Sequence, residues 1–250
     1  MTWKKLFGTI LVVLSTNFCF LTNEEYSLFY NGVVALSEER YDDAIAFFTL
    51  SNKQNPTHAG FLNLGLAYAK TKDWSSALWA SEVALKYDPN SSSAANNAAF
   101  ALKKINKDKS WSHPYSSLTK FLTGLDTQTW YMLTWFFSIL TAIMVVLAFY
   151  PNSMWRSKNI LFLLSILFLL LFLGTYFSGS KVTKHYVNLN YALPIHSTVK
   201  SYAREGGIKL NKHLEEGERY EILELRDQWV KLSYSDQKPV WVQLEDVRLY

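Results

Sequence analysis

Cysteine is almost absent from this sequence of 250 residues, and its one occurrence, Cys19, lies in an apolar N-terminal stretch. An intrachain disulfide and a metal site built from several thiolates are therefore both excluded. The five histidines are scattered without the spacing of metal ligands, and there is no glycine-rich phosphate loop. We predict no catalytic residues, no metal and no cofactor, so the chain is not expected to be an enzyme.

Charge is also scarce, at 18% of residues, and the net charge of +4 is not concentrated in a soluble region. Residues 22–129 contain 10 basic and 11 acidic residues, and residues 178–250 contain 11 and 10. The excess comes from residues that flank apolar segments, namely Lys4, Lys5, Arg156 and Lys158. Because nucleic acid requires basic charge gathered on one face, no nucleic acid is expected as a partner, and no motif indicates a small-molecule substrate.

Residues 1–21 have the organisation of a targeting segment, with two lysines ahead of an apolar run. Phe18 and its neighbours lack the small residue expected before a cleavage site. A cleaved signal peptide, an uncleaved signal anchor and a lipidated Cys19 remain as alternatives. In each case, the residues after about position 22 are exported.

Two further apolar runs are long enough to cross a bilayer. Residues 130–150 carry no charge, and residues 160–177 are almost wholly Leu, Phe and Ile. As helices they would measure roughly 31 Å and 27 Å, against a hydrocarbon core of about 30 Å. The alternative, a pair of buried core helices, needs more covering protein than this chain offers. We therefore predict two transmembrane α-helices.

The connector 151–159 is short, so the two spans are expected to form a hairpin. It holds two basic residues and no acid, which favours a cytoplasmic loop. Together with an exported N-terminal segment, this predicts a bacterial inner-membrane protein whose two soluble regions lie on the periplasmic side.

Residues 24–106 show an internal period of 33, because Gly32, Ala44 and Pro56 recur as Gly65, Ala77 and Pro89. This spacing resembles tetratricopeptide (TPR) repeats, in which small residues let two antiparallel helices approach and proline ends the second one. The resemblance implies an α-helical TPR solenoid with repeats at 24–56 and 57–89 and a capping helix at about 92–105. Residues 107–129 then form a linker. An unrelated helical bundle is the alternative.

TPR stacks bind peptides along a concave face, which the first helix of each pair lines. The repeat spacing places on that face Tyr26, Phe29, Val33, Leu62, Asn63, Leu66, Lys70, Asn96 and Lys103. For Phe29 and Leu66, packing between helices is an equal alternative. The basic clamp that some TPR proteins use for a C-terminal carboxylate is not visible.

Residues 186–250 change to the alternating pattern of short strands, with turns at glycines and at Asp236–Pro239. The order of Leu214–Leu223, Gln228–Leu232 and Val240–Val242 resembles bacterial SH3 (SH3b) domains, which are small all-β barrels. Val240 stands where that family usually has glycine. An aromatic groove for a proline-rich or cell-wall peptide is expected from Tyr202, Trp229, Tyr234 and Trp241. For Trp229 and Trp241, a mainly structural place in the core is the alternative.

The succession of signal segment, TPR pair, membrane hairpin and SH3b-like domain resembles BatE-like proteins of the aerotolerance (Bat) operons. That resemblance implies a non-enzymatic scaffold in envelope or oxidative-stress tolerance. It implies partners among membrane proteins with von Willebrand A domains and a MoxR-type ATPase. A second hypothesis is an envelope protein whose SH3b-like domain holds peptidoglycan and whose TPR region recruits a hydrolase.

Overall fold

The computed structural model describes residues 27–125, 127–149, 158–196, 198–234 and 237–250. The expected targeting segment 1–21, Tyr26 and most of the expected connector 151–159 lie outside these ranges. The chain divides into two compact units. The first unit comprises Met1–Tyr87, Ser91–Pro114 and Leu189–Tyr250, and the second comprises Asp88–Asn90 and Tyr115–Asn188. The first unit therefore unites both soluble regions, which the sequence analysis treats as separate domains.

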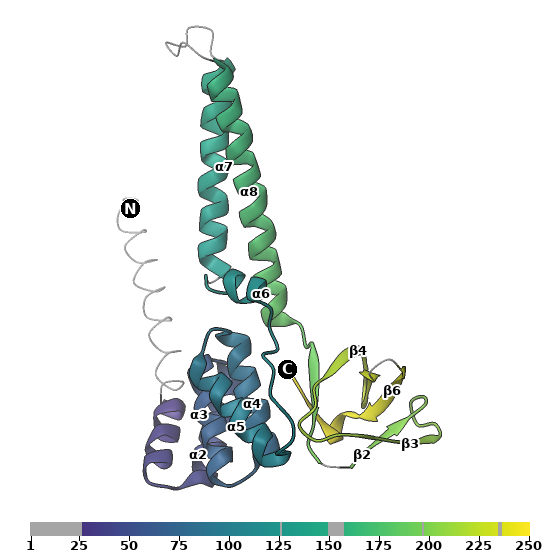
Figure 1. Cartoon of the computed structure of the whole chain (residues 1–250). Coiled ribbons are helices and arrows are strands. Elements are labelled where there is room, and N and C mark those ends of the chain that lie inside the picture. Colours follow the sequence, from purple (N-terminus) through teal and green to yellow (C-terminus); the bar gives the residue numbers. More distant parts are fainter. Residues whose placement is uncertain (1–26, 126, 150–157, 197, 235–236) are drawn as a thin grey trace, which may run out of the picture. The chain divides into compact units, whose positions relative to one another are not determined.

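The N-terminal part of the first unit is a run of antiparallel helices, shown in purple and blue in Figure 1. The helices are α1 Ser27–Ser37, α2 Tyr41–Gln54, α3 His58–Lys70, α4 Trp74–Tyr87 and α5 Ser92–Ile105. Side chains cap several of them, since Thr57 accepts from the backbone N–H of Gly60 and Ser91 from that of Ala94. The helix expected at 92–105 is present as α5.

The 33-residue period is visible in the backbone as well as in the sequence. Glu39 and Lys72, which are 33 residues apart, both adopt the left-handed region, with φ of 60° and 66°. They occupy the turns after α1 and α3 and stop both helices in the same way. The two helix pairs α1–α2 and α3–α4 are thus joined by equivalent turns.

Close approach within each pair depends on glycine. A Cβ atom on Gly32 would lie 2.7 Å from the ring of Phe48, and one on Gly65 would lie 3.0 Å from Ser81 Oγ. Phe48 and Ser81 are again 33 residues apart, and both are buried. The pairs therefore share one packing arrangement, with a large filler in the first and a small one in the second.

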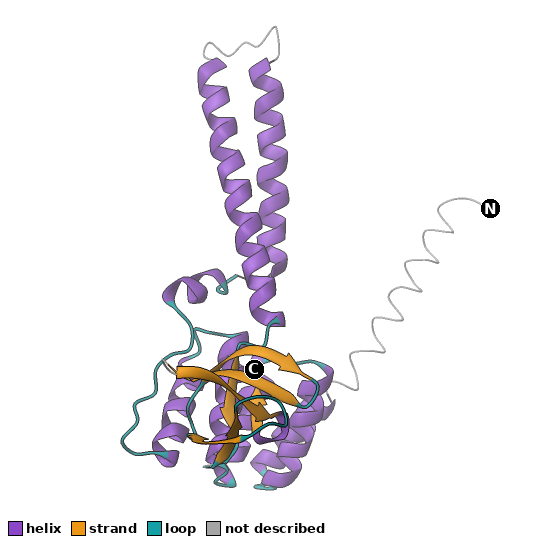
Figure 2. Ribbon diagram, turned by 90° about the vertical axis from the view of Figure 1, so that its right-hand side faces the viewer, coloured by secondary structure: helices purple, strands orange, loops and turns teal. Residues whose placement is uncertain are grey.

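The C-terminal part of the first unit is an antiparallel sheet (Figure 2). Among the described residues, the strands lie in the order β3-β2-β6-β5-β4-β1-β7. Their bounds are β1 Tyr191–Pro194, β2 Val199–Tyr202, β3 Lys209–Leu214, β4 Tyr220–Arg226, β5 Trp229–Tyr234, β6 Gln237–Gln243 and β7 Val247–Leu249, with a short 3₁₀ turn Leu244–Asp246 before β7. Gly217, in the turn before β4, has a φ of 79° that favours glycine.

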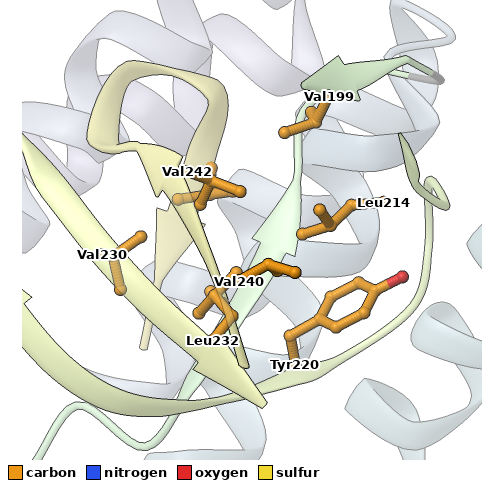
Figure 3. Packing of buried hydrophobic residues seen from close by; sticks show 9 residues of the cluster. Val199, Leu214, Tyr220, Val230, Leu232, Val240 and Val242 are labelled. Atoms are coloured by element: carbon orange, nitrogen blue, oxygen red, sulfur yellow. The ribbon is translucent and has the colours of Figure 1, made fainter. Parts of the chain in front are cut away.

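Alternate residues of these strands point inward and form the core shown in Figure 3. Val230 and Leu232 of β5 face Val242 and Val240 of β6 in direct register. All four are fully buried. This period-two burial follows from the pleat and confirms the strand pattern expected from the sequence. It also leaves the intervening side chains of β5 and β6 on the outer face.

The second unit is built on two long apolar helices, which run side by side in both views (Figures 1 and 2). A short helix, α6 Ser117–Leu122, precedes α7 Thr127–Phe149, and α8 Lys158–Val187 follows. Both long helices contain segments apolar enough to cross a membrane, of which only 6% and 17% of residues are buried. By length and composition, both helices could therefore span a membrane. Helix α8 continues for ten residues beyond the expected span 160–177. These last turns are helical like the span but have a more polar sequence.

Small and hydroxyl-bearing residues join α7 to α8. The Thr134 hydroxyl donates to Thr175 Oγ1 at 3.1 Å, and both side chains are buried. A Cβ atom on Gly179 would lie 3.2 Å from Cβ of Trp130, so glycine permits close contact there. This pattern is typical of helix pairing in membranes. We refer to α7 and α8 together as the hairpin.

Candidate functional site

The helical part of the first unit has an open groove between α3 and α5, with α4 beneath it. Its volume is about 360 Å³. The lining residues, which define the groove below, are Gly65, Leu66, Ala69, Lys70, Trp74, Ala77, Ser81, Asn97 and Phe100. Leu66 and Phe100 are 38% and 53% exposed, so the walls offer apolar surface to a ligand.

The groove is open because of the small residue Ser81. In the first helix pair the equivalent position holds Phe48, whose ring fills the space beside Gly32. In the second pair Ser81 turns its hydroxyl back to the carbonyl of Ala77 and leaves that space empty. One residue difference between the repeats therefore accounts for the position of the groove.

The rim of the groove is basic. Lys70 lines one wall, and the Lys104 ammonium lies 5.2 Å from the ring centre of Phe100 and 5.8 Å from that of Trp74. Trp74 and Phe100 pack edge to face, at 5.9 Å between ring centres. Two lysines beside an aromatic pair suit a ligand that combines an apolar side chain with a carboxylate.

The structure brings two of the residues expected on the concave face into the groove, Leu66 and Lys70. Phe29 packs against Phe48 at 5.7 Å between ring centres, which is the interhelical alternative raised for it. The remaining described residues do not line the groove: Val33, Asn96 and Lys103 are exposed, and Leu62 and Asn63 are half-buried.

The other seven groove residues were not predicted for the binding face, and among them Trp74, Asn97 and Phe100 have the large or polar side chains that a ligand would meet. The expected set takes the same repeat position on α3 and α5, for example Lys70 and Lys103. The two walls of one groove, however, face each other and use opposite edges of successive helices. The residues that line the two walls therefore occupy different positions of the 33-residue repeat. An aromatic residue in the otherwise small and polar sequence of α5, Phe100, could have indicated the second wall.

The outer face of the sheet carries an aromatic cluster, formed by Tyr202, Trp229 and Trp241. Tyr202 and Trp229 meet edge to face at 5.0 Å, and Tyr202 is the register partner of Trp241. The side chains of Arg226 and Lys231 lie over the Trp241 ring at 5.5 Å and 5.6 Å, and Trp241 is only 7% exposed. Trp229 is the half-buried, accessible member.

The fourth residue of the expected aromatic groove, Tyr234, lies apart from this cluster. Alternation along β5 places Tyr234 on the same face as Val230 and Leu232, and its ring stacks on Tyr220 beside the core at 6.1 Å. The sheet thus gathers three of the four expected residues. Neither tryptophan belongs to the core cluster of the sheet, although Trp241 is buried.

A polar interface, here called the seam, joins α4 to the sheet within the first unit. Trp79 Nε1 donates to the Leu249 carbonyl at 3.1 Å, and Arg248 lies over the Trp79 ring at 4.9 Å. A Cβ atom on Gly217 would lie 2.7 Å from Leu102 Cδ1, so the turn before β4 fits against α5 only as glycine. Lys109 adds ion pairs to Glu215 and Glu218.

Glu82 lies at the centre of the seam and is 1% exposed. Its carboxylate accepts from Trp111 Nε1 at 2.7 Å, from Arg219 Nε at 3.2 Å and from the Tyr250 hydroxyl. Burial raises the pKa of Glu82, and Arg219, Tyr250 and Trp111 oppose that rise. One turn further along α4, burial lowers the pKa of Lys86. Nothing in the sequence predicts that Glu82 and Lys86 are buried, because charged residues on a helix are ordinarily exposed.

Within the described ranges, no group of three or more His, Cys, Asp or Glu residues is arranged to hold a metal ion. Among the polar residues of the groove, the Ser81 hydroxyl donates to the Ala77 carbonyl, and Lys70 and Asn97 can offer hydrogen bonds to a ligand.

No protein-family model matches the sequence, and a search of the curated proteins finds no match. The chain combines two helices long and apolar enough to cross a membrane with a unit of antiparallel helices and an antiparallel sheet.

Proposed function

We propose that this protein is a non-enzymatic, membrane-anchored scaffold that binds protein partners in the groove of a TPR-type helical region. The observation that carries the proposal is the open groove, with exposed apolar walls and two lysines at its rim. The equivalent turns at Glu39 and Lys72, and the equivalent contacts of Gly32 and Gly65, support the TPR assignment. The antiparallel sheet, with its motifs in SH3b order, supports an SH3b-like barrel.

The proposed place of action is the periplasmic side of a bacterial inner membrane. The helices and the sheet of the first unit are separated in the sequence by the hairpin, yet they pack together through the seam. This packing supports the placement of both on the same side of the membrane. The basic connector and the targeting segment favour the periplasm. A Bat-type complex, with von Willebrand A domain proteins and a MoxR-type ATPase, is the proposed setting.

Substituting phenylalanine for Ser81 is expected to abolish peptide binding in the groove, because it installs the filler that the first pair has at Phe48. The measurement is fluorescence polarisation with the full-length protein in nanodiscs. The probes are labelled peptides with a central Leu or Phe flanked by Asp and Glu. Binding is expected to weaken at least about tenfold, the loss of roughly 1.4 kcal/mol.

The matched control is Ser37→Phe, which adds the same ring at an exposed position on α1, outside the groove. It should leave binding unchanged. Peptides with Lys and Arg in the flanks should bind more weakly than acidic ones, since the rim is basic. Equal binding by Ser81→Phe and the original protein would contradict the groove as the partner site.

The second candidate function is attachment to peptidoglycan through the aromatic cluster of the sheet. The half-buried Trp229, in contact with Tyr202, is the observation that favours it. If this function holds, purified peptidoglycan should retain the full-length protein in detergent, and Trp229→Ala should reduce retention several-fold. Removal of a stacking aromatic typically costs about 1–3 kcal/mol. Retention unaffected by Trp229→Ala, or no retention at all, would count against it.

A further inference from the structure

The second unit has a small pocket where α6 meets α8, just beyond the end of the apolar span. Its volume is about 220 Å³. The residues that line it, here called the headgroup pocket, are Leu118, Thr119, Leu122, Thr123, Lys181, Val182 and His185. The pocket thus combines an apolar floor with a lysine, an imidazole and two hydroxyl groups.

The position of the headgroup pocket relative to the bilayer follows from helix geometry. Lys181 lies four residues past Phe177, the last residue of the apolar run, which is about 6 Å along α8. A bilayer has about 5–7 Å of polar headgroup layer outside each edge of its hydrocarbon core. Tyr131 and Trp130, which pack against Gly179, provide the aromatic belt of that edge. Lys181 is therefore placed at the level of lipid phosphates.

The surroundings of the pocket match an anionic lipid. Leu118 and Phe121 of α6 are 58% and 72% exposed, and this apolar surface continues the lipid-facing surface of the hairpin. Trp130 Nε1 donates to the Leu122 carbonyl at 2.8 Å and fixes the end of α6 to α7. In the sequence, Lys120, Lys181 and Lys184 lie within α6 or near the end of α8. The positive charge of the pocket and the apolar surface beside it therefore match the anionic head and the acyl chains of a phospholipid.

We propose that the headgroup pocket binds the phosphate of an anionic phospholipid whose acyl chains lie along α6 and α8. Lys181 supplies the positive charge, and His185, held edge to face by Tyr115 at 4.8 Å, forms the adjoining wall. Leu118 and Phe121 contact the upper part of the acyl chains. The proposal is independent of the groove and its partners.

The test is native mass spectrometry of the full-length protein, with phosphatidylglycerol titrated into detergent. The Lys181→Gln variant should bind this lipid at least about fivefold more weakly, since it loses the charge-assisted hydrogen bond from the pocket to the phosphate. Lys184→Gln is the matched control, because Lys184 lies on the same helix at similar depth but does not line the pocket. It should stay within about twofold of the original protein.

Two further arms separate the possible sources of phosphate. Neutral phosphatidylcholine should bind weakly and show no dependence on Lys181. Inorganic phosphate should not displace phosphatidylglycerol, because the acyl chains contribute to binding. An equal loss in Lys181→Gln and Lys184→Gln, equal binding of the neutral lipid, or displacement by inorganic phosphate would each overturn the proposal.

Discussion

In the Arg219→Met variant, the seam is expected to unfold far more readily than in the original protein at neutral pH. Removing one partner of a buried ion pair typically costs about 3–5 kcal/mol, because the remaining charge is left without its counter-ion. Glu82 is 1% exposed, so its carboxylate has no access to water as a substitute. Trp111 and Tyr250 still donate to it, which places the expected loss at about 3 kcal/mol, the lower end of that range.

This loss should depend on pH. Burial raises the pKa of Glu82, and removal of Arg219 takes away an interaction that opposes the rise, so the pKa should increase further. A carboxyl group whose pKa is higher in the folded state holds its proton more tightly there. Its stability contribution is therefore fully present below the unfolded value near 4.5 and is lost as pH rises through the folded pKa. The deficit of Arg219→Met should shrink from about pH 7.5 to about pH 5.

Hydrogen exchange of peptides covering α4 and β7, in the full-length protein in nanodiscs, measures this local stability. Arg226→Met is the control, because Arg226 pairs with Glu205 and Glu224 on the exposed outer face. It should cost no more than about 1 kcal/mol and show no such pH dependence. The double variant Arg219→Met with Glu82→Gln should lose the pH dependence. A deficit in Arg219→Met that is the same at both pH values would refute the role assigned to Glu82.

Cysteine labelling in intact cells is expected to modify positions in both parts of the first unit fully and a position in the connector not at all. In a Cys19→Ser background, Lys107→Cys and Glu221→Cys should both react with an impermeant maleimide. Lys107 and Glu221 are exposed, one after α5 and the other on β4. Ser153→Cys, in the connector, should react only after the inner membrane is permeabilised. The reason is that the seam holds both soluble parts on one side while the basic connector stays in the cytoplasm.

Glu221→Cys and Lys107→Cys also serve as controls for each other. If only one of them reacted, the seam would not exist in the cell, since its two sides would lie in different compartments. If Ser153→Cys reacted and the other two did not, the orientation would be inverted. The proposed periplasmic scaffold would then fail, although the hairpin itself would stand.

Local patterns in the sequence predicted most of the secondary structure. The period of 33 predicted two helix pairs in which Gly32 and Gly65 allow close approach, and the uncharged runs predicted α7 and α8, because each signal is contained within one element or one pair. The alternation in β5 and β6 likewise separated core from outer residues. Such signals arise from the helix period and the strand pleat, which depend on neighbours in the chain.

The seam could not be predicted in the same way. Glu82 is acidic and Lys86 is basic, and on a helix facing water both would be ordinary surface residues. They are buried because residues more than a hundred positions later, from Gly217 to Tyr250, cover α4. Long-range contacts of this kind leave no periodic trace. The inward position of Tyr234, by contrast, follows from alternation along β5, because it lies two residues after Leu232, and the sequence pattern already separates it from Trp229.

The seam also sets an order for biogenesis. Helices α1 to α5 leave the ribosome first, but the strands that cover α4 are synthesised only after both spans. Until then Trp79 and Glu82 are open to solvent and to proteases or chaperones. The seam can therefore form only after the whole chain, including both apolar helices, has been synthesised.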